Sequence, residues 1–156
     1  MDSLHLHLML AHIPVVGFGF ATLSLVAALF SAARGDKILG RWALLLVTVS
    51  SLSSIPTVMT GEKSQDRASR IPDISMDIIE THEEAAETAA MIGYAAGTAA
   101  FAGLGISLLR GKGLKISLAV VLILSLASLG TMGWAAFKGG EIRHSEIRSG
   151  DGPILQ

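Results

Sequence analysis

The sequence predicts an all-α integral membrane protein, a four-helix bundle of up-down topology. Of its residues, 51% are hydrophobic and only 16% are charged, with a mean hydropathy of +0.57, whereas a soluble domain averages about 25% charged residues. The charges lie in short clusters separated by long apolar runs, each of the length that a helix needs to cross a bilayer. We therefore expect residues 1–156 to form a single membrane domain solvated by lipid.

The first two apolar runs predict one helical hairpin. The first run, about residues 8–33, ends at residues 34–37, whose glycine and charges favour a short turn outside the lipid. The second, about residues 38–60, ends at the sequence Gly61-Glu62-Lys63. The N-terminus lacks the basic region of a cleavable signal, so we expect the first run to remain a membrane helix.

The remaining runs predict a second hairpin. A polar segment of residues 61–80, containing Pro72, precedes a helix expected over residues 82–110. Its helical pattern begins near residue 75, which makes it too long for the bilayer alone at about 1.5 Å per residue. The fourth helix is expected over residues 116–137, followed by a polar tail of residues 138–156.

Charge predicts the orientation of these helices. The two short connections and the residues beside them hold one acid, Asp36, and six basic residues: Arg34, Lys37, Arg41, Arg110, Lys112 and Lys115. The positive-inside rule places them in the cytoplasm. We expect an inner (plasma) membrane protein with both termini outside, in the periplasm if the source is a bacterium. Net charge is −1 without a basic run, which argues against nucleic acid as a partner.

The two hairpins form a weak internal repeat. Each runs from a histidine through an apolar helix, a basic turn and a second apolar helix to a glycine–glutamate pair. His12 with Thr60-Gly61-Glu62 corresponds to His82 with Gly139-Gly140-Glu141. Because each half has two helices, the pattern predicts two helical-hairpin repeats related by an axis along the membrane normal.

All five histidines are predicted at the same membrane face, where a histidine is costly unless it is paired or faces the bundle interior. His82 heads a stripe of small residues that includes Ala89 and Gly93, and His12 is followed at i+7 by Gly19 as His82 is by Ala89. Two inward histidines on diagonal helices could bind haem iron from opposite sides. The alternative is that the stripe only allows close helix packing.

The other histidines and the nearby charges leave several interpretations open. His5 and His7 are either interfacial polar residues or ligands, and His144 is either a tail residue or a ligand of a second haem. Arg143 would pair with a haem propionate or anchor the interface. Glutamates beside His82 would permit a metal site, although His82 has alanines at i+3 and i+4, and the acids also suit a solvated helix start.

The motifs His12-Ile13-Pro14, Thr60-Gly61-Glu62, Thr81-His82-Glu83 and Gly139-Gly140-Glu141 resemble those of a widespread bacterial family. Its members are four-helix membrane proteins of unknown function that are sometimes fused to Rieske-type iron–sulfur domains, and the resemblance covers nearly the whole chain. It implies an electron-transfer context with haem b as the cargo. This chain has no cysteine and no room for the iron–sulfur domain, so its electron partner would be a separate redox protein or a membrane quinone.

Together these patterns favour a b-type cytochrome with one haem b, or two, ligated by His12 and His82. No catalytic residue is predicted, because nucleophile-elbow, nucleotide-loop and His-Glu-x-x-His motifs are absent from the sequence. We therefore expect an electron carrier rather than an enzyme of substrate turnover. The alternatives are a structural or partner-binding subunit of a membrane complex and a His/Glu metal-dependent membrane enzyme. A homo-oligomer is compatible with each of them.

Overall fold

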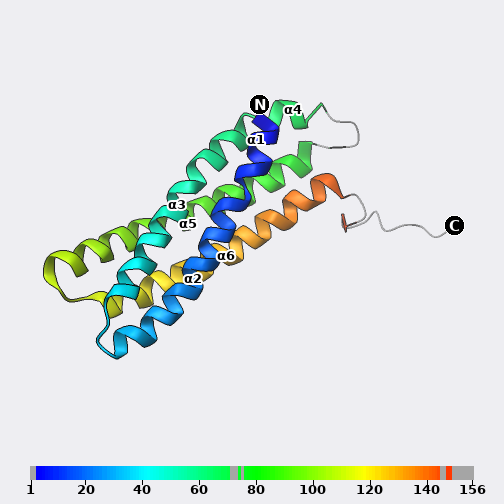
Figure 1. Cartoon of the computed structure of the whole chain (residues 1–156). Helices are drawn as coiled ribbons and strands as arrows, with labels where there is room; N and C mark the ends of the chain where they lie inside the picture. Colours follow the sequence, from blue (N-terminus) through cyan, green and yellow to red (C-terminus); the bar gives the residue numbers. More distant parts are fainter. Residues whose placement is uncertain (1–2, 71–73, 75, 145–146, 149–156) are drawn as a thin grey trace.

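The computed structural model describes residues 3–70, 74, 76–144 and 147–148, and within these residues all regular structure is helical (Figure 1). The predicted all-α fold is confirmed. The helices are α1 (Ser3–Leu10), α2 (His12–Ala33), α3 (Ile38–Glu62), α4 (Gln65–Ala68), α5 (Met76–Arg110) and α6 (Leu114–Arg143).

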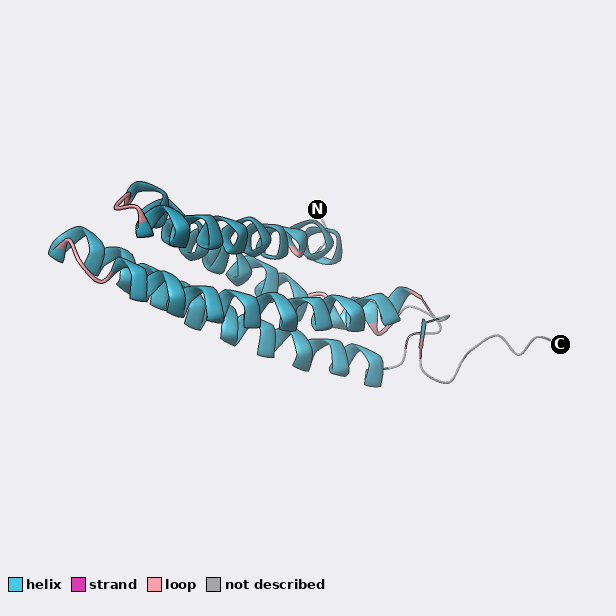
Figure 2. Ribbon diagram, turned by 90° about the horizontal axis from the view of Figure 1, so that it is seen from below, coloured by secondary structure: helices cyan, strands magenta, loops and turns pink. Residues whose placement is uncertain are grey.

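The four long helices form a closed ring. Helix α2 packs on α3, α3 on α5, α5 on α6 and α6 on α2. The connections 34–37 and 111–113 lie together at one end of the bundle, which we call the loop end (Figure 1, lower left). The starts of α1 and α5 and the ends of α3 and α6 lie at the opposite end, which we call the histidine end (Figures 1 and 2).

Four helical segments are long and apolar enough to cross a membrane: Ser3–Ala33, Ile38–Glu62, Met76–Arg110 and Leu114–Arg143. Large apolar side chains such as Phe20, Leu23 and Phe30 are exposed on the outside of the bundle, whereas many interior residues are alanine, serine or glycine. Small interior residues with large outward ones are typical of helices that pack within lipid. The architecture is that of a multi-pass membrane protein.

Several helix boundaries differ from the predicted ones. Helix α1 was not predicted as a separate element, and α6 continues to Arg143 instead of ending near residue 137. Helix α5 begins at Met76, in agreement with the helical pattern near residue 75. Pro72 and residues 149–156 of the predicted tail lie outside the described residues.

Pro14 explains why the first membrane segment is divided into α1 and α2, and it leaves one carbonyl that needs another hydrogen-bond donor. A proline in the first turn of α2 has no backbone N–H to donate to the carbonyl of Leu10. The chain turns at Ala11, and the hydroxyl of Thr57 in α3 lies 3.2 Å from the Leu10 carbonyl oxygen and 3.2 Å from that of Ser53 in its own helix, so its proton is shared between them. The contact fixes α1 against α3.

The predicted repeat appears in the burial pattern. Seven residues of α2 are buried, and the residue 75 positions later in α5 is buried in every case. Five of the seven buried residues of α3 have a buried counterpart 78 positions later in α6. The α2/α5 pairs are Pro14/Ala89, Phe18/Gly93, Ala21/Ala96, Thr22/Gly97, Leu25/Ala100, Ala28/Gly103 and Ala32/Ser107. The two hairpins are therefore structural repeats.

Candidate functional site: two histidine–carbonyl pairs at one end of the bundle

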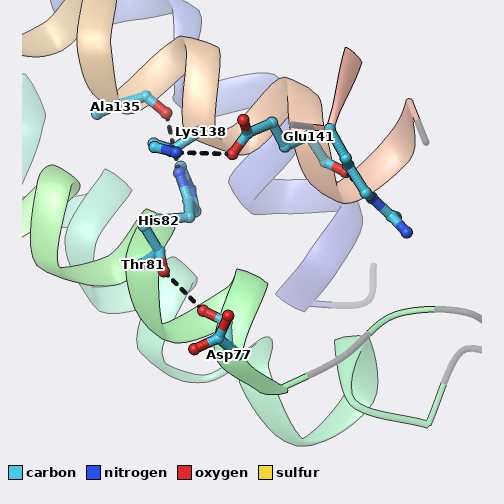
Figure 3. A network of polar contacts seen from close by, with 7 residues as sticks. Asp77, Thr81, His82, Ala135, Lys138 and Glu141 are labelled. Atoms are coloured by element: carbon cyan, nitrogen blue, oxygen red, sulfur yellow. Dashed lines mark hydrogen bonds and ion pairs between the residues drawn. The ribbon is translucent and has the colours of Figure 1, made fainter. Parts of the chain in front are cut away.

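His82 forms a hydrogen bond from α5 to the backbone of α6 (Figure 3). Its Nδ1 lies 2.9 Å from the carbonyl oxygen of Ala135, and the side chain is half-buried. A helical carbonyl points toward the residue four positions later, which here is Gly139. A Cβ atom at Gly139 would lie 3.0 Å from Cε1 of His82, so the glycine leaves room for the imidazole above the carbonyl.

His7 has the same arrangement in the first hairpin. Its Nδ1 lies 3.0 Å from the carbonyl oxygen of Thr57, and this side chain is also half-buried. A Cβ atom at Gly61, again four residues beyond the accepting carbonyl, would lie 3.1 Å from Cε1 of His7. A histidine, a carbonyl and a glycine thus recur in both halves with the same local geometry.

The two sites are equivalent under the repeat that relates the helices. His7 and His82 are 75 positions apart, and Gly61 and Gly139 are 78 apart, the spacings found in the buried core. The register expected from the sequence, which aligned His12 with His82 and Gly61 with Gly140, was wrong. Pro14 lies in the first turn of a new helix, and the sequence pattern therefore matched His82 to His12 at the start of α2. Its structural counterpart is His7, which lies in α1.

These hydrogen bonds define the imidazole tautomers. A backbone carbonyl only accepts, so Nδ1 of His7 and of His82 carries the proton and donates it. Each Nε2 then has an unshared lone pair, and neither has a hydrogen-bond partner in the described part of the chain. Metal-bound histidines commonly have this arrangement.

The remaining histidines have different surroundings. His12 is exposed, and its Nδ1 lies 3.1 Å from the carbonyl oxygen of Leu8 in the preceding helix. His5 is exposed on α1, and His144 is exposed at the C-cap of α6. All five described histidines lie at the histidine end, but His7 and His82 are the two that are half-buried and bonded to a neighbouring helix.

The small residues below His82 contact protein side chains. A Cβ atom at Gly93 would lie 3.4 Å from Ser128 Oγ and 3.7 Å from Phe18 Cε2. Ala89 is buried in the same core, whereas a Cβ at Gly19 would have no described heavy atom within 4 Å. Ala89 and Gly93 therefore pack against core side chains in this structure.

A group of charges beside His82 was missed by sequence reasoning. Lys138 Nζ pairs with Oε2 of the buried Glu141 at 2.9 Å, next to the His82–Ala135 hydrogen bond (Figure 3). The ammonium also lies 4.9 Å from the ring centroid of Trp134. The i, i+3 and i, i+4 spacings of these residues on one predicted helix could have indicated the group. Arg143, expected to be near a ligand, is exposed at the end of α6.

The acidic residues near His82 do not join it in a metal centre. Across the described ranges, no three histidine, aspartate or glutamate side chains are arranged to hold a metal ion. The candidate site therefore consists of two histidines with free Nε2 atoms.

No family model, curated protein or solved structure matches this chain. The fold and the candidate site alone define its class: a helical bundle with four candidate membrane-spanning helices and two equivalent histidine sites at one end.

Proposed function

We propose that this protein is a membrane cytochrome of the b type, in which His7 and His82 hold haem iron at the histidine end. The observation that carries the proposal is that both imidazoles donate from Nδ1 to a backbone carbonyl and keep Nε2 free. Imidazole nitrogens are common axial ligands of haem iron, and a carbonyl on the other nitrogen raises the basicity of the ligand.

His7 replaces His12 in this proposal. His12 is held against its own chain and is exposed, whereas His7 is the structural counterpart of His82. Bound haem would supply a one-electron couple between ferrous and ferric iron. The protein would hold the two rings in one orientation and one tautomer, and the cationic Arg143 at the same end suits an acidic haem substituent.

The distribution of charge supports an orientation of the protein in the membrane. The basic loop end suits the cytoplasmic side, which leaves the histidine end and both termini outside. Electrons would then pass between a membrane quinone, or a membrane partner, and a redox protein outside. Substrate turnover by this chain is not required.

The test is a reduced-minus-oxidised visible spectrum of the detergent-purified protein with a haem-to-protein ratio. We expect the sharp α and Soret bands of six-coordinate haem, their loss in His7→Ala and in His82→Ala, and their retention in the matched control His12→Ala. A normal spectrum in both His7→Ala and His82→Ala would contradict the ligand assignment. A ratio of two haems per protein would make His144 the candidate ligand of the second haem.

A second candidate is a structural or partner-binding subunit of a membrane complex. The filled contacts around Gly93, where Phe18 and Ser128 occupy the space beside the glycine, favour it. It predicts a colourless protein after expression with ample haem, and losses of stability in His7→Ala and His82→Ala no larger than that of one inter-helix hydrogen bond.

A further inference from the structure

The loop end of the bundle contains a cleft that the histidine site does not use. It has a volume of about 400 Å³ and lies between the two connecting loops. Its lining includes Gly35, Lys37, Lys112, Gly113, Lys115 and Ile116. Under the repeat, Lys37 corresponds to Lys115 and Gly35 to Gly113, each pair 78 positions apart. Both glycines have positive φ, 94° and 85°, so the two halves build the cleft from equivalent turns.

The cleft carries positive charge that the described residues do not neutralise. The ammonium of Lys37 donates to the carbonyl of Gly111 at 2.8 Å, which holds this charge across the gap between the loops. Asp36 is the acid of these connections, and its two oxygens accept from Ser31 Oγ at 2.9 Å and from the Ile38 N–H at 2.8 Å. In the described part of the chain, Lys112 and Lys115 have no hydrogen-bond or ion-pair partner.

We propose that this cleft binds the phosphate of an anionic phospholipid headgroup through Lys112 and Lys115, with Lys37 holding the two loops in place. The chemistry recognised is a phosphate anion, since three lysines line the cleft and the two connections contain a single acid, Asp36, whose oxygens accept from Ser31 and Ile38. The uncapped first turn of α6 adds favourable partial charge at the same place.

The position of the cleft favours a lipid over a free phosphate as the source of that anion. The cleft lies at the ends of four candidate membrane-spanning helices, the level at which headgroups lie. One of its walls is Ile116, which is 74% exposed on the outer surface where acyl chains would pack. Basic pockets between membrane helices commonly bind anionic headgroups.

The experiment is native mass spectrometry of the delipidated full-length protein, titrated with phosphatidylglycerol or with phosphatidylcholine. We expect phosphatidylglycerol to bind more tightly to the wild type. Lys112→Gln/Lys115→Gln should weaken that binding about tenfold or more, since each basic residue near a membrane surface contributes appreciably to anionic lipid binding. Lys63→Gln/Arg70→Gln makes the same charge change at the histidine end and should bind like the wild type.

Three results would overturn the proposal: equal binding of the two lipids, an equal loss in Lys63→Gln/Arg70→Gln, or displacement of phosphatidylglycerol by an equal concentration of inorganic phosphate, which would indicate a site for free anions. If the double variant does not elute as a single folded species, Lys112→Gln alone serves as the test. Lys112 is exposed in the loop, and its loss should weaken binding severalfold.

Discussion

The two hairpins present the same histidine–carbonyl–glycine site on differently built helices. In the first hairpin, His7 belongs to a short helix that ends before Pro14, whereas His82 belongs to a continuous 35-residue helix that has Ala89 at the position equivalent to Pro14. The residue whose carbonyl accepts the imidazole hydrogen bond also differs between the hairpins: it is Thr57 in the first and Ala135 in the second. Thr57 has a hydroxyl that satisfies the Leu10 carbonyl, and its counterpart Ala135 has none.

This difference shows that the site constrains the backbone carbonyl and the glycine more than the accepting side chain. In α5 the carbonyl of Ala85, equivalent to that of Leu10, lies within a regular helix, where the N–H of Ala89 is its partner. No hydroxyl is therefore required on α6. The Thr57 hydroxyl therefore contacts the break at Pro14, whereas the Thr57 carbonyl belongs to the histidine site.

A second difference lies in the core, where large residues of α2 oppose small residues of α5. Phe18 is fully buried and its counterpart is Gly93, and Leu25 is fully buried with Ala100 as its counterpart. Phe18 Cε2 lies 3.7 Å from a Cβ placed on Gly93, so the large residue fills the space left by the small one. The repeat is thus symmetric in backbone and burial but complementary in side-chain volume.

The largest effect is expected from breaking this volume complementarity. Phe18→Ala should destabilise the bundle by about 3–5 kcal/mol, because a buried aromatic is replaced by a cavity. The measurement is unfolding of the purified protein in mixed micelles. Phe20→Ala is the matched control, since Phe20 is two residues away on the same helix and 64% exposed. Equal losses in the two variants would contradict the asymmetric packing described here.

Removing the Thr57 hydroxyl should cost about 1–3 kcal/mol, because Thr57→Val leaves the Leu10 carbonyl without its partner. Pro14→Ala should restore an N–H for that carbonyl and rescue much of the loss. A double-mutant cycle of unfolding free energies measures this coupling. Thr48→Val is the control, since Thr48 bonds to the Leu44 carbonyl of its own helix. Additive effects of Thr57→Val and Pro14→Ala would refute the link between proline and threonine.

Gly61→Ala and Gly139→Ala should perturb the two histidine sites equally. Each added methyl would lie about 3 Å from an imidazole, so the ring must move and its Nδ1–carbonyl hydrogen bond weakens, at a cost on the order of 1 kcal/mol. Imidazole ¹⁵N chemical shifts report the tautomer directly. Gly140→Ala is the control, since a Cβ there would lie 3.5 Å from Ile147 Cδ1, an ordinary contact. If Gly140→Ala shifts the His82 signals and Gly139→Ala does not, the repeat register is wrong.

Much of this fold follows from the sequence, because apolar length, basic turns and the repeated order of motifs are local properties. These local properties predicted the four helices, the hairpin repeat and the gathering of the histidines at one end. The choice of His7 over His12 could not, because it depends on which histidine reaches a carbonyl on another helix. The pairing of each glycine with its histidine is likewise a contact between distant residues.

The smallest effect is expected at the two connecting loops, where only the first has an acid that contacts the following helix. The Ile38 N–H and, secondly, the Ser31 hydroxyl bond to Asp36 and hold the pKa of its carboxyl below the usual 3.8. A lowered pKa means that this stabilisation is present above pH 3.8 and is lost as the pH falls through the folded-state value.

Asp36→Asn should therefore remove a small part of the acid sensitivity of unfolding, measured as thermal midpoints between pH 6 and about pH 2.5. The equivalent position in the second hairpin is Leu114, the first residue of α6, which cannot titrate. An identical pH profile for Asp36→Asn and the wild type would mean that the two loops contribute alike and that the Asp36 contacts do not stabilise the start of α3.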